Sequence, residues 1–294
     1  LLKKSSMNKL DDLKPVFSVV IPTYERPGDL RKCLLSLSSE QQNGASPYEL
    51  IVTDDSKNDT SQKLISKEFP NVSWGEGKKK GPAGNRNAGV ARAKGEWIVF
   101  IDDDCIAQPE FLSAYENAIK SDPKLGALEG RIYPDRPKKT WAEGCPENEY
   151  GGMFWTSNLC VKKSLFIELQ GFDESFEVAF EDVDFAHRLA KAEINTTFVY
   201  GAAVCHPWRS LRSGGKNWKR KGYELESLAL FLEKHPEASS KYGSAYTYLR
   251  HFCRMLSKDL AFCILHFKGR GIDTLLTQAT TTLRTAWFVR KFKS

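Results

Sequence analysis

The chain of 294 residues is 41% hydrophobic and 12% aromatic, which is enough to bury a large core and excludes an intrinsically disordered protein. Its formal net charge of +6 comes from the C-terminal segment, because Lys241 to Ser294 hold ten basic and two acidic residues and leave residues 1–240 at −2. A basic surface confined to one terminal segment, without a recognition motif, argues against nucleic-acid binding.

Two further patterns bear on where the protein works. No apolar run approaches the roughly 18 uninterrupted residues that span a bilayer, and no signal peptide opens the chain. The seven cysteines are scattered without a Cys-x-x-Cys pair, which argues against both a disulfide framework and a structural zinc site. We therefore expect buried, reduced thiols and a cytoplasmic location.

The N-terminal part of the chain alternates short, β-branched apolar runs with stretches of helical spacing. The predicted strands are residues 17–22, 49–54 and 96–101, and the predicted helices are residues 30–37, 60–69 and 84–94. Strands that alternate with helices at this spacing build a mostly parallel sheet with helices on its faces. The fold class predicted from this pattern is therefore α/β.

The rest of the chain is less regular. Residues 134–150 are rich in Pro, Lys, Glu and Gly, which indicates a mobile loop over the site. Residues 155–207 have the pattern of a strand, a turn and the start of an acidic helix. Beyond Gly222 the apolar spacing predicts helices over residues 223–234, 242–268 and 272–293.

Three of the predicted strands end in polar or acidic side chains. Thr23 follows the first strand, Asp54 and Asp55 end the second, and residues 102–104 follow the third. Ligands of open α/β sheets bind in the crevice outside the carboxyl ends of the strands. We therefore expect these side chains to share one rim of the sheet.

The run Asp102-Asp103-Asp104 is the most informative of these strand ends. Three adjacent carboxylates repel one another unless a cation lies beside them, and Mn²⁺ or Mg²⁺ binds carboxylate oxygens together with substrate phosphates. Because alternate residues of a strand share a face, Asp102 and Asp104 would form an Asp-x-Asp site for a metal-bound diphosphate. The alternative is a solvated acidic turn ahead of the next helix.

A basic, glycine-bearing loop precedes the third predicted helix. It runs from Lys78 through Gly81 and Gly84 to Arg86 and Asn87. Helix N-termini attract phosphate, and the Arg86 guanidinium suits a bidentate contact with phosphate oxygens. A merely solvated lysine run is the alternative. The loop lacks the Gly-Lys-Ser/Thr of a Walker A motif, which argues against kinase or ATPase chemistry.

Two further groups of residues are candidates for chemistry. Glu181 and Asp182 stand at the start of an acidic helix, where either a general base beside an acceptor hydroxyl or simple matching to the helix dipole accounts for them. His206, which precedes a proline, is either a structural histidine or a ligand of a divalent metal.

Taken together, these segments resemble glycosyltransferase family 2, the inverting group built on the GT-A fold. The matching motifs are Val-Val-Ile-Pro-Thr-Tyr-Glu-Arg-Pro (19–27), Ile-Val-Thr-Asp-Asp-Ser (51–56), Gly-Asn-Arg-Asn-Ala-Gly (84–89), the strand and acidic run of 95–104, Ser-Asn (157–158), Gly-Phe-Asp-Glu (171–174) and the acidic helix of 181–189. They follow the family's order over residues 16–210. The resemblance implies a Rossmann-like GT-A fold with a mixed, mostly parallel central sheet flanked by helices, followed by a C-terminal helical extension.

The resemblance also implies roles for individual residues. Those implied to bind the nucleotide sugar are Pro22, Thr23, Tyr24, Glu25, Arg26, Asp54, Asp55, Gly81, Arg86, Asn87, Asp102 and Asp103. The implied metal ligands are Asp104 and His206, which would hold Mn²⁺ or Mg²⁺. The implied catalytic residues are Asp182, as the base, and Glu181. The implied acceptor-side residues are Trp155, Ser157 and Asn158.

Some positions depart from the family's pattern on the acceptor side. Gln170 and Glu193 stand where glycine is common, and Thr156 takes a place often held by glycine. These differences leave the identity of the acceptor open.

The activity implied is transfer of a sugar, with inversion, from a nucleoside diphosphate to an acceptor hydroxyl of a glycan or lipid-linked acceptor, in bacterial-type surface polysaccharide or glycan assembly. Uridine diphosphate is the nucleotide expected on family grounds. Two alternatives remain. A nucleotidyltransferase uses a similar sheet and would release pyrophosphate. A non-catalytic partner in a polysaccharide assembly complex would tolerate loss of Asp104 or Asp182, and this chain keeps both.

The predicted organisation has three parts. They are an N-terminal extension (1–15), a catalytic domain (16–220) with a nucleotide-binding half (16–110) and an acceptor-binding half (111–220), and a C-terminal helical extension (221–294). In the last part Trp287, Phe288 and Phe292 lie among basic residues, which suits an interfacial helix at the inner face of the cell membrane. Packing on the catalytic domain and a dimer contact are the alternatives.

Overall fold

The computed structural model describes residues 14–139, 143–210, 215–242, 250, 280, 282–283 and 285–287. It divides the chain into two compact units. The first comprises residues 1–135, 146–177 and 181–207, and the second comprises residues 136–145, 178–180 and 208–294. Every candidate site residue named above lies in the first unit.

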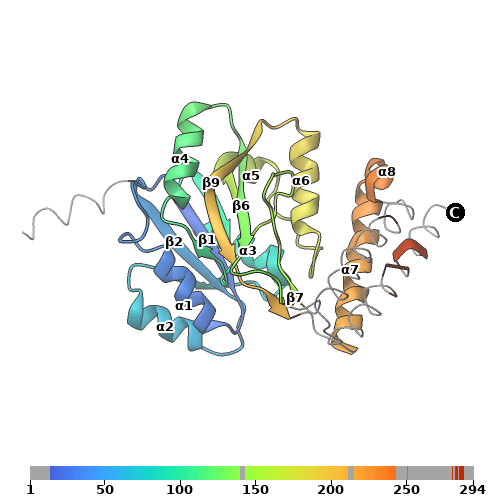
Figure 1. The fold of residues 1–294 in the computed structure, drawn as a ribbon, viewed down its shortest axis with the longest axis horizontal. Helices are drawn as coiled ribbons and strands as arrows, with labels where there is room; N and C mark the ends of the chain where they lie inside the picture. Colours follow the sequence, from blue (N-terminus) through green and yellow to red (C-terminus); the bar gives the residue numbers. More distant parts are fainter. Residues whose placement is uncertain are drawn as a thin grey trace, which may run out of the picture. The chain divides into compact units, whose positions relative to one another are not determined.

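Figure 1 labels the helices and several of the strands. The strands of the first unit are β1 (Phe17–Thr23), β2 (Tyr48–Asp54), β3 (Ser73–Glu76), β4 (Trp97–Ile101), β5 (Ile106–Ala107), β6 (Ala127–Pro134), β8 (Asn158–Lys162) and β9 (Thr196–His206). Its helices are α1 (Pro27–Ser36), α2 (Thr60–Glu68), α3 (Gly81–Arg92), α4 (Phe111–Ser121), α5 (Lys163–Glu168) and α6 (Glu181–Lys191). The second unit holds β7 (Glu143–Gly144), β10 (Arg209–Ser210), α7 (Gly215–Lys234), a 3₁₀ turn (Pro236–Ala238) and α8 (Ser239–Tyr242).

The sheet of the first unit is mixed, and the half of it that holds β1 to β4 is parallel. Its strand order is β3-β2-β1-β4-β8-β6-β9-β5. Strands β1, β2, β3 and β4 run parallel to their neighbours in this half, as does the β6–β9 pair, whereas β8 is antiparallel to both β4 and β6. This arrangement confirms the predicted GT-A architecture.

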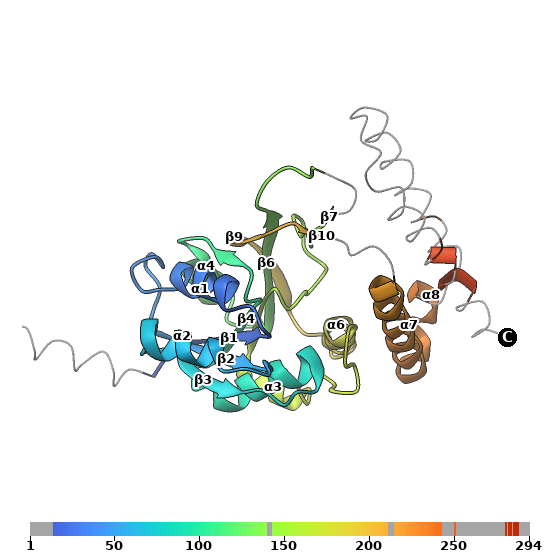
Figure 2. The same ribbon diagram turned by 90° about the horizontal axis from the view of Figure 1, so that it is seen from below.

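Helices cover both faces of this sheet, because its central strands are apolar on both sides. On β1, Phe17, Val19 and Ile21 pack with α1 and α4, whereas Val20 packs with α3. Figure 2 shows α1 and α4 on one side of the strands and α3 on the other. The parallel pairing of β1 with β2 and β4 brings the carboxyl ends of these three strands to one edge, where the candidate site lies.

The predicted elements of the N-terminal part are confirmed, with boundaries that differ by a few residues. Besides the two-residue strands β5, β7 and β10, three strands of the structure were not predicted: β3, β6 and β9. Their sequences contain Gly, Glu or Pro, which are uncommon in strands, so their apolar residues form no clear run. Helix α7 begins at Gly215, ahead of its predicted start at residue 223.

Helices α5 and α6 end with a residue in the left-handed backbone region. These residues are Gln170 (φ 64°) and Glu193 (φ 52°), the two positions at which the family's pattern commonly has glycine. The next residues donate back into the helices, from Gly171 N to Phe166 O over 2.8 Å and from Ile194 N to Leu189 O over 3.2 Å. Both ends therefore form Schellman motifs in which a side-chain-bearing residue takes the place of the usual glycine.

The C-terminal extension is described only in part. The helices predicted over 242–268 and 272–293 fall largely outside the described residues, as do Phe288 and Phe292, so the predicted division of the chain at residue 220 and the interfacial helix stay predictions. Within the part of the chain that the structure describes, no helix combines the length and the apolar character needed to cross a bilayer.

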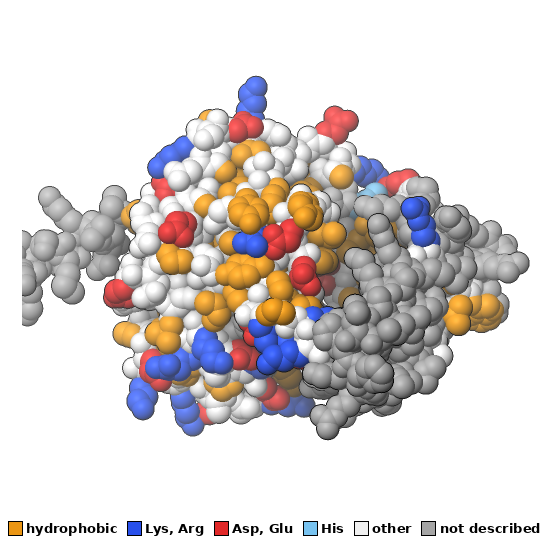
Figure 3. Space-filling model, viewed as in Figure 1, with side chains coloured by type: hydrophobic (Ala, Val, Ile, Leu, Met, Phe, Trp, Pro, Cys, Tyr) orange, Lys and Arg blue, Asp and Glu red, His pale blue; other side chains and the backbone are white. Residues whose placement is uncertain are grey.

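The surface of the first unit mixes hydrophobic and charged side chains. Figure 3 shows hydrophobic groups across one face, with Lys and Arg interspersed among acids. The largest exposed hydrophobic side chains of this unit are Tyr24, Leu35, Tyr150, Met153, Ile167 and Tyr200.

Candidate active site

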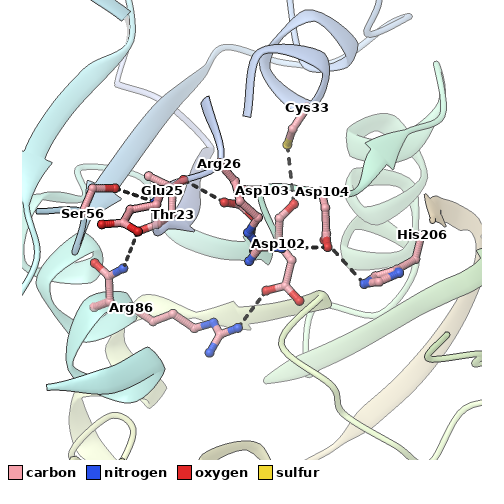
Figure 4. A network of polar contacts seen from close by, with 11 residues as sticks. Thr23, Glu25, Arg26, Cys33, Ser56, Arg86, Asp102, Asp103, Asp104 and His206 are labelled. Carbon is pink, nitrogen blue, oxygen red and sulfur yellow. Dashed lines mark hydrogen bonds and ion pairs between the residues drawn. The ribbon is translucent and has the colours of Figure 1, made fainter. Parts of the chain in front are cut away.

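The ends of β1 and β4 meet at the centre of the candidate site (Figure 4). Thr23, the last residue of β1, donates its hydroxyl to Asp103 Oδ2 over 2.7 Å. Both side chains are buried. The rim predicted from the strand ends is therefore present, and it is held together by direct contacts between side chains from different strands.

The acidic run 102–104 does not behave as a continuation of the strand. Strand β4 ends at Ile101, and the three carboxylates that follow it contact different partners. Asp102 meets Arg86 at 2.7 Å, Asp103 meets Thr23 and Arg26, and Asp104 meets Arg26 and His206. The alternation expected to pair Asp102 with Asp104 is lost because the chain turns at this point. Asp103 and Asp104, rather than Asp102 and Asp104, share a common partner.

That common partner is Arg26, which follows β1 and precedes α1. Its Nη2 lies 3.1 Å from Asp103 Oδ1 and its Nη1 lies 3.0 Å from Asp104 Oδ2. The Arg26 side chain is 42% exposed, whereas the two carboxylates are almost completely buried. Burial raises the pKa of Asp103 to about 7, against the opposing effect of the Arg26 charge and the Thr23 hydrogen bond.

Asp104 and His206 have the arrangement expected of metal ligands. His206 Nε2 lies 3.4 Å from Asp104 Oδ1, and both side chains are buried. The other ring nitrogen, Nδ1, lies 2.8 Å from the Pro207 carbonyl oxygen and donates to it, so that Nε2 faces Asp104. A backbone carbonyl on the second nitrogen is the usual way in which a metal-binding histidine is oriented.

A third potential ligand atom lies in the same cluster, the thiol of Cys105. Burial holds the pKa of this thiol well above its usual range, and the neighbouring aspartates add to the effect, so it stays protonated. A carboxylate and an imidazole suit Mn²⁺ or Mg²⁺, whereas a protonated thiol is a poor ligand for either ion. The residues present therefore fit the expected divalent metal through Asp104 and His206.

Arg86 links the acidic run 102–104 to the start of helix α6. It projects from α3, is only 5% exposed, and contacts Asp102 Oδ1 through Nη2 (2.7 Å) and Glu181 Oε1 through Nη1 (3.0 Å). A buried guanidinium between two carboxylates is stabilised by both charges, which raise the pKa of Arg86 although burial opposes them. The structure thus places Arg86 between the acidic run and the predicted catalytic pair.

Glu181 and Asp182 open helix α6 but differ in their surroundings. Glu181 is buried, and burial together with the Asp182 charge raises the pKa of Glu181 to about 7, with Arg86 opposing the shift. Asp182 is partly exposed, and its Oδ1 accepts the backbone N–H of Val183 over 2.8 Å. Burial also raises the pKa of Asp182. Among the described residues Asp182 has no salt bridge, which leaves it the better placed of the two to accept a proton.

The end of β2 lies beside this centre. Asp54 is buried and its Oδ1 accepts the N–H of Ser56 over 2.8 Å, whereas Asp55 is only half-buried and accepts the N–H of Lys79 over 2.9 Å. Burial raises the pKa of Asp55. Ser56 also accepts the N–H of Glu25 over 2.7 Å, which holds the loop after β1 against the end of β2.

Two residues here were not among the sequence candidates, Ser56 and Asn85. Asn85 is buried on α3, donates to Thr23 O over 3.4 Å, and has a side-chain oxygen without a hydrogen-bond partner in the described structure. A Cβ at Gly77 would lie 2.3 Å from that oxygen and 2.1 Å from Asp55 Oδ1, so any side chain at this position would displace both groups. The signal in the sequence was their position inside the matching motifs 51–56 and 84–89.

Other predicted nucleotide-binding residues lie around the rim in differing settings. Pro22 is buried within β1, and Tyr24 is exposed just beyond it. Gly81, at the start of α3, has φ 80° and a Cβ there would lie 2.0 Å from Glu177 O. The Asn87 amide donates to Phe172 O over 2.8 Å and accepts the Phe172 N–H over 3.0 Å. These last two residues hold α3 against the segment that follows Gln170.

The predicted acceptor-side residues are integrated into the core. The Asn158 side chain is 1% exposed; its Oδ1 accepts the Tyr115 hydroxyl over 2.5 Å, and its Nδ2 donates to Arg131 O and Ala202 O over 2.9 and 2.8 Å. Ser157 is buried, and Trp155 is half-buried against the core. Their position on the acceptor side stays a prediction.

The loop before these residues folds around a carboxylate that sequence reasoning missed. Glu129, on β6, is buried and accepts the Asn148 amide over 2.9 Å and the backbone N–H groups of Met153 and Phe154 over 3.0 and 2.9 Å. A lone glutamate beside a glycine gives no sequence signal for this role, because its partners lie about twenty residues further along the chain.

Two family models match the chain. Residues 18–161 match glycosyl transferase family 2, and residues 97–266 match glycosyl transferase family group 2, which is more than half of the chain. The chain therefore belongs to glycosyltransferase family 2.

Curated relatives agree with this assignment. An uncharacterized glycosyltransferase of Haemophilus influenzae is 27% identical over 59% of this chain and 62% of its own length. An N-acetylglucosaminyl-diphospho-decaprenol L-rhamnosyltransferase of Mycobacterium tuberculosis is 26% identical over 65% of this chain and 76% of its own. The chain spans only 62%, 30% and 22% of the lengths of three curated relatives, so it represents part of the length of such proteins.

Among solved structures, residues 1–349 of Staphylococcus aureus TarS superpose with a TM-score of 0.57 at 19% identity, covering 73% of this chain and 64% of that one. The same part of TarS in complex with UDP gives a TM-score of 0.54. This likeness supports the GT-A fold.

Proposed function

We propose that this chain is an inverting glycosyltransferase that moves a sugar from a nucleoside diphosphate, UDP in the first instance, to the hydroxyl of a glycan or lipid-linked acceptor. The proposal rests on one juxtaposition above all. Arg86 joins Asp102, on the rim where a diphosphate would bind, to Glu181 beside the candidate base Asp182. The candidate donor-binding group Asp102 and the group beside the candidate base thus share one arginine, which is itself buried.

The nature of the donor and acceptor is supported by the relatives. The name of the M. tuberculosis relative describes transfer to a diphospho-decaprenol-linked sugar, and a structurally similar part of TarS was solved with UDP. A lipid-linked acceptor would place the enzyme at a membrane surface, which the basic C-terminal segment suits. The metal dependence rests on the fit of Asp104 and His206 to a divalent ion.

The chain's own residues account for the transfer chemistry. Asp182 accepts the proton of the acceptor hydroxyl while that oxygen attacks the anomeric carbon from the side opposite the diphosphate. The bond from the anomeric carbon to the diphosphate oxygen breaks, and the nucleoside diphosphate leaves with the electron pair, so one displacement inverts the configuration. Asp104 and His206 would hold a divalent metal, which supplies charge neutralisation for a diphosphate when bound.

The proposal is tested by incubating the full chain with Mn²⁺ and a panel of UDP-, GDP- and dTDP-linked sugars, with and without lipid-linked acceptors. We expect release of a nucleoside diphosphate. Release of pyrophosphate from a nucleoside triphosphate and a sugar phosphate would instead identify a nucleotidyltransferase. A lack of affinity for every nucleoside diphosphate and sugar conjugate, measured by calorimetry with Mn²⁺ present, would rule out the proposed donor class.

The role of Asp182 is tested by Asp182→Asn, which removes the proton acceptor and keeps the side-chain shape. We expect transfer to fall by roughly 10²- to 10⁴-fold, while UDP binds with unchanged affinity. Asp59→Asn is the matched control, because Asp59 lies on the surface in a salt bridge with Lys63. Normal turnover in Asp182→Asn would exclude this residue as the base.

A further inference from the structure

The Arg26 guanidinium lies where a cation is expected. It bridges Asp103 and Asp104 at 3.1 and 3.0 Å, and Asp104 is also the residue that faces His206 across 3.4 Å. Two buried carboxylates side by side repel one another unless a positive charge lies between them. In this structure, Arg26 supplies that charge.

The two sides of this contact differ in how firmly they are held. Asp103 is fixed by the Thr23 hydroxyl at 2.7 Å, and it and Asp104 are buried. Arg26 is 42% exposed and projects from the loop between β1 and α1, directly after Glu25, whose φ is 52°. The carboxylates are therefore the fixed partners, and the guanidinium is the partner that solvent reaches.

We propose that Arg26 holds the cation's place in the nucleotide-free protein and leaves it when a nucleoside diphosphate binds. The guanidinium fork that spans two carboxylates matches two phosphate oxygens equally well. Transfer of Arg26 from Asp103 and Asp104 to the diphosphate frees Asp104 for the metal. This inference rests on the proposed function and adds to it an order of events, in which the nucleotide promotes metal binding.

The consequence is a positive coupling between the two ligands. The apparent affinity for the metal equals the intrinsic affinity multiplied by the fraction of molecules in which Arg26 has left the carboxylates. If that fraction is one in ten, the metal binds about tenfold more weakly. Because coupling is reciprocal, the metal also strengthens nucleotide binding. A purely structural arginine would lower stability when removed but would produce no such coupling.

The test is a titration of the full chain with Mn²⁺, followed by the electron paramagnetic resonance signal of the free ion. Without nucleotide, we expect Arg26→Gln to bind Mn²⁺ about tenfold more tightly than the unaltered protein. Arg31→Gln is the matched control: Arg31 lies on α1, is half-exposed, pairs with Glu68 at 2.6 Å, and loses the same charge. Its Mn²⁺ affinity should be unchanged.

The same titration with saturating UDP measures the coupling. UDP should strengthen Mn²⁺ binding to the unaltered protein by about tenfold more than it strengthens binding to Arg26→Gln. Arg26→Lys should lie between the two, because a lysine ammonium contacts one carboxylate rather than bridging both. An Mn²⁺ affinity in Arg26→Lys equal to that of the unaltered protein would show that charge alone suffices and would overturn the inference.

An unchanged or weaker Mn²⁺ affinity in Arg26→Gln, measured without nucleotide, would also overturn it, as would a complete absence of Mn²⁺ binding. These outcomes are distinct from failure of the proposed function. Suppose that UDP bound neither protein while Arg26→Gln still bound Mn²⁺ more tightly. The proposed donor would then be wrong, although Arg26 would still compete with the metal. The inferred order of events, in which the nucleotide promotes metal binding, would be overturned.

Discussion

At the scale of single residues, the surroundings of each charged group decide its chemistry. Arg86 and Arg26 have the same side chain and both contact carboxylates of the run 102–104. Arg86 is buried between Asp102 and Glu181, whereas Arg26 is exposed on one side. Removing a partner from a buried ion pair leaves an uncompensated charge, so Arg86 acts as a fixed link between groups. Arg26 can be reached by a competing ligand from solvent, but its two buried partners then need another cation, which a metal at Asp104 would supply.

The raised pKa of Glu181 predicts how stability depends on pH. The folded protein holds this proton up to about pH 7, whereas the unfolded chain releases it near the ordinary value of 4.5. The contribution to stability is therefore fully present below pH 4.5 and is lost as the pH rises towards 7. We expect this fall to be about 3 kcal/mol and to be smaller in Glu181→Gln, which does not titrate.

The measurement is urea unfolding of both proteins at several pH values across that window. Glu181→Gln also replaces the group that Arg86 contacts, which shifts stability by itself, so the slope with pH is the informative quantity. Equal slopes for the two proteins would show that Glu181 releases its proton at its ordinary pKa in the folded state.

The sequence predicted which polar residues gather at the edge of the sheet. It did not predict which of them form hydrogen bonds or ion pairs with one another. Thr23 and the acidic run were expected at one edge because parallel strands end together, and they meet there. Which carboxylate pairs with which partner depends on the direction of the chain after Ile101. That direction is set by packing against α1 and β9, far away in the sequence.

At the scale of elements, the C-terminal ends of α5 and α6 contain backbone strain. Gln170 and Glu193 hold a left-handed backbone that disfavours residues with a Cβ by about 1–2 kcal/mol. The end of α5 leads into the segment that Asn87 contacts, whereas the end of α6 lies at the opposite end of that helix from Glu181. Having Gln170 and Glu193 in place of glycine therefore lowers the stability of these two helix ends.

Glu193→Gly should relieve this strain. Glycine adopts the left-handed region freely but loses more conformational entropy on folding, so we expect a net gain of about 0.5–1 kcal/mol in the free energy of unfolding. Thermal or urea unfolding measures it. Glu193→Ala removes the same side-chain charge without relieving the backbone, and it should give no gain. A gain of equal size in Glu193→Ala would attribute the effect to charge instead.

Elements with continuous apolar runs were predictable, and those with mixed sequences were not. The central parts of β1, β2 and β4 are buried on both faces, so each strand contains a continuous apolar run. β9 is half-exposed over its first part and contains a glycine, so its strand character comes from pairing with β6 rather than from its own pattern.

At the scale of the whole chain, the candidate site and the net positive charge lie in different parts of the sequence. The candidate site lies entirely in the first unit, whereas the net positive charge lies beyond residue 240. The end of the chain combines Trp287 with Arg290, Lys291 and Lys293. Basic residues near an anionic surface contribute about 1 kcal/mol each at physiological ionic strength.

Deletion of residues 280–294 should therefore weaken binding to vesicles of phosphatidylglycerol by more than tenfold, and high salt should weaken binding of the full chain in the same way. Co-sedimentation with vesicles measures both effects, and UDP affinity should be unchanged by the deletion. Equal sedimentation of the full and shortened chains would argue against a membrane role for this segment.

The sequence by itself determined the family, the succession of the central strands and helices along the chain, and the edge of the sheet at which the candidate residues gather. These features follow from local apolar patterns and from motifs that keep their spacing. Only the tertiary structure decided that Arg26 bridges Asp103 and Asp104, that Arg86 joins Asp102 to Glu181, and that Glu129 anchors the loop before Trp155. Each of these contacts joins residues that are far apart in the chain, and their geometry depends on how buried charges find partners after the strands have packed.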